Sequence, residues 1–95
     1  MPEMRFLIRW PDGTAESCYS PSLVIKDCFA PGEAYRLDDF VAKSRIALNI
    51  ASERVRAKYG FACSSAMDQL ARIEAAAKAF SHLPDACVIV DAFQE

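Results

Sequence analysis

The segment KYGFACSS, Lys58–Ser65, holds the densest group of side chains that could do chemistry. It lies where one expected helix ends and the next begins. The first amides of a helix are unpaired, and the helix dipole adds partial positive charge beside them. This junction therefore has the chemistry of a site for a carboxylate or phosphate. The candidate anion-binding residues are Arg54, Arg56, Lys58, Ser64 and Ser65.

The same residues also have a purely structural interpretation, which the sequence favours. Basic side chains in the last turns of a helix stabilise its negative end, and serines in front of a helix are ordinary caps.

Cys63 is the candidate reactive thiol, because a thiol at a helix start near cations can become nucleophilic. A nucleophile needs a base, and the only histidine, His82, follows nineteen positions later. At ~1.5 Å per residue along a helix, this separation is nearly ~30 Å. A Cys–His pair within one subunit is thus excluded, whereas one across an oligomer interface remains open. The sequence favours a structural role for Cys63.

The spacing of the cysteines gives little support for a metal site. Cys18, Cys28, Cys63 and Cys87 form no CxxC pair, and a single histidine removes the usual mixed zinc sets. A four-cysteine site assembled from distant elements remains the alternative. We expect mostly buried thiols in a reducing cytoplasm, with no metal and no cofactor.

No motif of a catalytic site is present. The sequence lacks a P-loop, GxGxxG and HExxH, and its three glycines leave little material for a phosphate cradle. The carboxylates form no pair spaced for acid–base work, so we expect no catalytic residues. A net charge of −2 argues against nucleic acid or an anionic membrane as partner. No apolar run is long enough for a signal peptide or membrane span, which predicts a cytoplasmic protein.

The order of strands and helices expected from the residue pattern predicts an α+β fold. We expect a single domain over residues 1–95. Alternating apolar residues predict a β-hairpin from Met4–Trp10 and Thr14–Tyr19, turning at Pro11–Gly13. Ser20 and Pro21 favour a short helix over Pro21–Phe29, with an extended stretch as the alternative.

Two long antiparallel helices should follow. The first opens at Asp38 and Asp39 and ends at Gly60 in the left-handed conformation, with Phe61 folding back onto its last turn. Ser64 or Ser65 caps the second, which Pro84 ends.

Ala86–Phe93 then forms a closing strand, apolar on both faces and therefore inside the sheet. We expect about three strands with both long helices on one face, a two-layer sandwich. The uncovered face around Leu7 predicts a homodimer.

Two stretches, RWPDGTAESCYSPSLVIKD (Arg9–Asp27) and ASERVRAKYGFACSSA (Ala51–Ala66), resemble a family of small bacterial nitrogen-starvation response proteins found in nitrilase-containing gene clusters. The similarity runs over nearly the whole chain. It implies a cytoplasmic protein induced under nitrogen limitation and encoded beside enzymes of nitrile or cyanide assimilation. It implies no catalytic residues and no cofactor.

Together these observations predict a non-enzymatic accessory or binding protein. Its partner is expected to be an enzyme of the same gene cluster or a small anionic metabolite. The alternatives are a small thiol-dependent enzyme using Cys63 and an anion-binding regulatory module at the helix junction.

Overall fold

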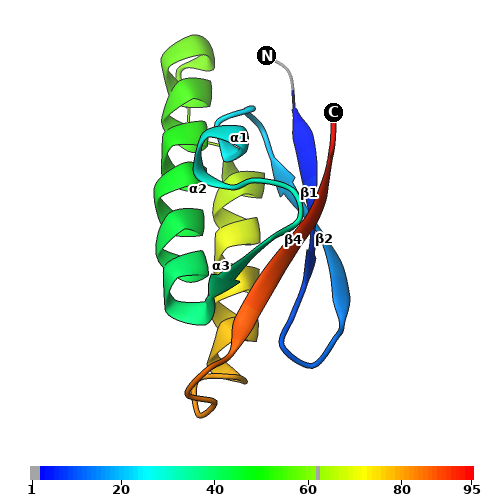
Figure 1. Cartoon of the computed structure of the whole chain (residues 1–95). Coiled ribbons are helices and arrows are strands. Elements are labelled where there is room, and N and C mark those ends of the chain that lie inside the picture. The colour runs from blue at the N-terminus through cyan, green and yellow to red at the C-terminus, as the bar shows by residue number, and fades with distance from the viewer. Residues whose placement is uncertain (1–2, 62) are drawn as a thin grey trace.

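The computed structural model describes residues 3–61 and 63–95 and shows a two-layer α+β arrangement (Figure 1). Helices α2 and α3 pack side by side as an antiparallel hairpin and cover one face of a β-sheet. This confirms the predicted fold class and the placement of both long helices on one face. The elements in chain order are β1 (Met4–Arg9), β2 (Ala15–Ser20), α1 (Ile25–Cys28), β3 (Glu33–Arg36), α2 (Leu37–Tyr59), α3 (Ser64–Lys78) and β4 (Cys87–Gln94).

The sheet has four antiparallel strands in the order β2-β1-β4-β3, rather than the predicted three or so. Strand β4 lies inside the sheet, as its apolar residues predicted. The strand that the sequence did not reveal is β3, four residues long and placed directly after Pro31 and Gly32. Its pairing with β4 comes from the far end of the chain, so local residue patterns carry little trace of it.

A β-bulge interrupts the backbone pairing of β1 with β4, so that no residue of β1 lies opposite Asp91 in the register. Phe93 consequently lies opposite Phe6 and packs against the core. Uninterrupted alternation would put Phe93 on the same face as Ile89, but one inserted residue exchanges the two faces of a strand.

The end of α2 confirms the role predicted for Gly60. This residue has φ +85° and donates its backbone N–H to the carbonyl of Arg56 at 2.8 Å. Glycine takes this left-handed conformation without the steric cost that a Cβ imposes. Phe61, however, is 68% exposed, so the expected packing of its ring onto the last turn is not observed.

The starts of two helices differ from prediction. The N-cap of α3 is Cys63, without a side-chain capping bond, and Ser64 and Ser65 already lie inside the first turn. Helix α1 is one turn, Ile25–Cys28, rather than Pro21–Phe29. The Ser20 hydroxyl donates to the carbonyl of Ser22 at 2.7 Å, a local turn that replaces the predicted cap.

The Trp10 side chain is part of the hydrophobic core. Its ring packs edge-on against Phe40 with a centroid distance of 5.8 Å and stacks on Phe80 at 5.9 Å. The indole Nε1 donates to Glu16 Oε1 at 3.0 Å, which satisfies its one polar group. These rings join the hairpin to α2 and to the turn that follows α3.

The four cysteines are less uniformly buried than predicted. Cys18 is buried, Cys28 and Cys63 are half-buried and Cys87 is exposed, and all four are free thiols. Burial, with the neighbouring Glu16 carboxylate, raises the pKa of Cys18 and keeps its thiol protonated.

The sheet face away from the helices carries both apolar and charged side chains. Leu7 is half-buried there and Ile89 is 37% exposed, while Arg9 and Asp91 form an ion pair at 3.4 Å. The homodimer inferred for this face stays a prediction. Within the part of the chain that the structure describes, no helix combines the length and apolarity that crossing a membrane requires.

Candidate functional site

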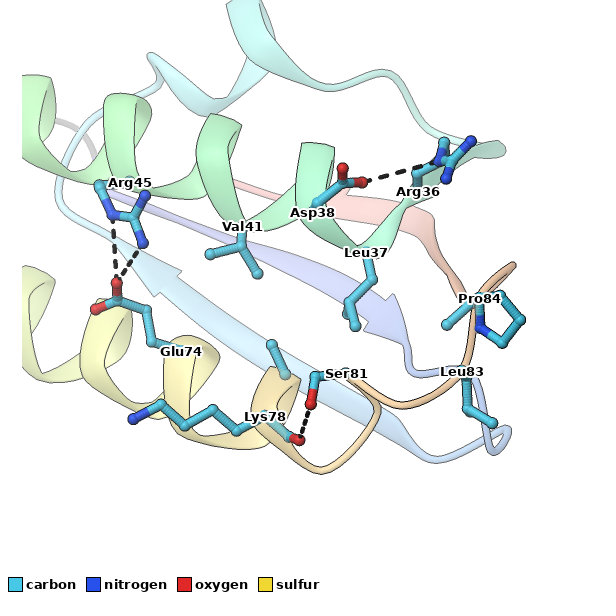
Figure 2. A pocket seen from close by; sticks show the side chains of 12 residues that line it. Arg36, Leu37, Asp38, Val41, Arg45, Glu74, Lys78, Ser81, Leu83 and Pro84 are labelled. Atoms are coloured by element: carbon cyan, nitrogen blue, oxygen red, sulfur yellow. Dashed lines mark hydrogen bonds and ion pairs between the residues drawn. The ribbon is translucent and has the colours of Figure 1, made fainter.

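A groove lies at the end of the helical hairpin opposite Gly60, where α2 begins and α3 ends (Figure 2). Its volume is about 540 Å³, within the range of roughly 300–1,000 Å³ that small-molecule sites occupy. We call it the mouth groove. Its lining residues are Arg36, Leu37, Asp38, Val41, Arg45, Glu74, Ala77, Lys78, Ser81, Leu83, Pro84 and Ala86.

The apolar part of the mouth groove comes from three segments. Leu37 and Val41 project from the first turns of α2 into the space between the helices (Figure 2). Ala77 lines the same groove from α3. Leu83, on the loop that leads to β4, adds a 42% exposed side chain at one end. The backbone N–H of Leu37 donates to Ala86 at 3.0 Å, so the start of α2 is held against this loop. The groove thus presents an apolar surface on a fixed frame.

An ion pair crosses the groove between the two helices. Arg45 of α2 donates to Glu74 Oε2 of α3 through Nη2 at 2.7 Å and through Nε at 3.3 Å (Figure 2). At the other end, Arg36 and Asp38 approach to only 3.9 Å, with both side chains largely exposed. Exposed pairs of this kind contribute little stability, about 0–1 kcal/mol each.

Lys78 is the lining cation without an ion-pair partner among the described residues. Three basic and two acidic side chains line the groove, which leaves a net charge of +1. An apolar surface with one cation that no described carboxylate pairs suits a small molecule that has an apolar body and a carboxylate.

Two polar groups of the mouth groove are engaged with other groups of the protein. The hydroxyl of Ser81 donates to the backbone carbonyl of Lys78 at 2.9 Å, where it completes the end of α3. The Arg45 guanidinium is engaged with Glu74. The lining residues include neither cysteine nor histidine.

The basic residues predicted from the helix junction are spread over separate contacts. Arg54 donates through Nη1 to the hydroxyl of Ser22 at 2.9 Å, a part-buried bond to the loop before α1. Arg56 pairs with Glu53 at 3.7 Å on the exposed side of α2. Arg54 thereby links α2 to the loop before α1.

The remaining junction candidates also separate. The ammonium of Lys58 lies over the ring of Tyr59, 5.6 Å from its centroid, and Ser64 is exposed. Residue 62 of this segment lies outside the described residues. Ser65 lines a second groove of about 400 Å³ at the edge of the sheet, which we call the edge groove. Its lining residues are Arg5, Ser17, Tyr19, Ser65, Asp68, Gln69 and Arg72.

Cys63 and His82 lie beyond opposite ends of α3. The fifteen residues of this helix separate them by about 22 Å at ~1.5 Å per residue. The distance prevents them from acting as a pair within one molecule. Residues 3–61 and 63–95 contain no group of three or more histidine, cysteine or acidic side chains placed to hold a metal ion.

Residue types and spacing along the chain did not point to the mouth groove. Its residues come from two stretches of the chain, 36–45 and 74–86, and neither stretch by itself has the pattern of a binding site. One usable signal was the opposite charge of Arg45 and Glu74, which face one another once the helices fold back at Gly60.

Comparison with known proteins identifies a family but gives no molecular function. A family model described as nitrogen starvation-induced protein NitG matches residues 5–93. Searches of curated proteins and of solved structures give no match. The resemblance to nitrogen-starvation proteins is confirmed over residues 5–93, whereas the nitrilase gene cluster stays a prediction. The family description states a condition of expression rather than a molecular role.

Proposed function

The chain belongs to the NitG family of nitrogen starvation-induced proteins, and we propose that it serves this response as a non-enzymatic binding protein. The mouth groove binds a small organic acid, with its apolar body on Leu37 and Val41 and its carboxylate at Lys78. The observation that carries the proposal is the Lys78 cation, which has no ion-pair partner in residues 3–61 and 63–95, beside an apolar groove of about 540 Å³.

The two parts of the groove recognise different parts of such a ligand. Burial of apolar ligand surface contributes most of the binding free energy, at roughly 25 cal/mol per Å² before the cost of association. The contact with the exposed Lys78 contributes less, because water and salt screen it. It selects a carboxylate over a neutral molecule of the same shape.

The proposed setting is the cytoplasm, beside enzymes that assimilate nitrogen from nitriles or cyanide. Complete hydrolysis of a nitrile releases ammonia and leaves a carboxylic acid with the apolar body of the substrate. A binding protein in this setting meets ligands of the chemistry that the mouth groove accepts. The protein partner included in the proposal is an enzyme of the same pathway.

The experiment is a titration of ¹⁵N-labelled protein with hexanoate, followed by NMR. We expect the amide signals of Val41, Ala77 and Lys78 to shift together. The Lys78→Met variant keeps the aliphatic stem and removes the charge, so hexanoate binding should weaken by about threefold to fivefold.

Two controls make the titration specific. Hexanol, which lacks the carboxylate, should bind equally to both forms of the protein. Lys58→Met removes a lysine at the opposite end of α2 and should leave hexanoate affinity unchanged. Equal affinity in Lys78→Met and the unmodified protein, or shifts confined to another surface, would contradict the proposal.

A further inference from the structure

Gln69 lies in the edge groove with one half of its amide unpaired. The side chain comes from the second turn of α3 and is only 6% exposed. Its Oε1 accepts the backbone N–H of Tyr19 on the edge strand β2 at 3.0 Å, which fixes the orientation of the amide. The Nε2 is buried without a hydrogen-bond partner among the described residues. A buried donor in this state favours a ligand that brings an acceptor.

Charged side chains from two elements line the same groove as Gln69. Arg5 of β1 donates through Nη1 to the hydroxyl of Ser17 at 3.3 Å. Arg72 and Asp68, one turn apart on α3, form no ion pair with each other or with any other described residue. The edge groove thus offers two guanidinium groups and one carboxylate. Guanidinium groups bind carboxylates through paired hydrogen bonds.

The start of α3 adds further donors on the same side. Ser65 lines the groove from the first turn of the helix, and the N-cap residue Cys63 supplies no side-chain capping bond. Amides of a first turn that lack a cap remain available to an anion. The helix start alone does not define a ligand, but here it lies beside the unpaired amide of Gln69.

We infer that the edge groove binds a free α-amino acid. Its carboxylate lies between the Gln69 amide and the Arg72 guanidinium, and its ammonium group lies at Asp68. The carboxylate of Asp68 opposes a plain anion such as phosphate but complements a molecule that carries both charges. This site is separate from the mouth groove, so its test is independent of the hexanoate titration.

The test follows the side-chain amide signals of Gln69 by NMR while the intact protein is titrated with L-alanine, acetate, methylamine or inorganic phosphate. L-alanine should shift these signals at the lowest concentration. Acetate should need about tenfold more, because it lacks the ammonium group. Methylamine and phosphate should leave Gln69 unshifted.

Exposed-residue variants test the two charges without disturbing the core. Arg72→Gln should weaken L-alanine binding about tenfold, and Asp68→Asn should weaken L-alanine but not acetate. Arg56→Gln is the matched control on α2 and should change neither. Gln69→Glu keeps the acceptor for Tyr19 and replaces the unpaired donor with a carboxylate, so binding should be lost.

The inference is overturned if L-alanine fails to shift Gln69 at tens of millimolar. It is equally overturned if Arg72→Gln binds as the unmodified protein does. Acetate or phosphate binding as tightly as L-alanine, with no effect of Asp68→Asn, would exclude an amino acid as the ligand.

Discussion

The two ends of the helical hairpin differ in what they are made of. At the mouth end, the rings of Trp10, Phe40 and Phe80 pack together, and the mouth groove lies beside them. At the junction end, the chain turns at Gly60, and the nearby edge groove is lined by polar side chains. Helix-terminus chemistry drew attention to the junction, yet the larger of the two grooves lies at the other end, between the start of α2 and the end of α3.

The largest effect on stability is expected for Trp10→Ala at the mouth end. Removal of a buried indole that contacts both Phe40 and Phe80 should lower the free energy of unfolding by about 3–5 kcal/mol. Urea denaturation measures this change. Trp10→Phe keeps much of the packing and should cost clearly less. A loss below about 1 kcal/mol for Trp10→Ala would show that the aromatic group does not hold the mouth end together.

Gly60→Ala tests the junction end in isolation. A Cβ at this position meets no atom within 4 Å, so its cost comes only from the positive φ of +85°. We expect a loss of about 1–2 kcal/mol in the free energy of unfolding. Gly60→Asn is the control, because asparagine tolerates this conformation better and should cost less. Equal stability of the alanine variant and the unmodified protein would show that the helix does not require this turn.

The smallest expected effect is on the ionisation of Tyr19, which lines the edge groove. Burial, a hydrogen bond from the phenol to Glu3 Oε2 at 3.1 Å, and the Glu3 charge raise the pKa of Tyr19 to about 12. The folded protein therefore holds this proton more tightly than the unfolded chain. The associated stability is present below the ordinary value near 10 and is lost as pH rises through about 12.

Ultraviolet titration of tyrosinate measures this ionisation directly. Tyr19→Phe should remove an absorbance step centred near pH 12. Glu3→Gln should move the Tyr19 step to lower pH, because the variant removes the negative charge beside the phenol. A Tyr19 step near pH 10 in the unmodified protein would contradict this arrangement.

Much of the fold was predictable because its causes lie within a few residues. Alternation in Met4–Arg9 produced a strand, and apolar spacing through Phe40 and Leu48 produced α2. Gly60 ended that helix as predicted. By contrast, Ser64 or Ser65 was expected to be the N-cap of α3, whereas Cys63 holds that position. Capping depends on backbone angles that neighbouring packing can shift.

The candidate sites were far less predictable. Gln69 looks like any polar residue of a helix until β2 comes beside it and donates the N–H of Tyr19. Lys78 looks like an ordinary basic residue near a helix end until Arg45 takes Glu74 as its partner. In both cases the decisive contact joins residues far apart in the chain.

The sequence by itself determined the α+β class, the two long helices, the left-handed turn between them and the place of the last strand inside the sheet. Only the tertiary structure decided the fourth strand, the bulge at Asp91 and both grooves. The physical reason is the range of the interactions. Turn geometry and apolar periodicity act between near neighbours, whereas strand pairing and cavity shape depend on which distant segments come to share a surface.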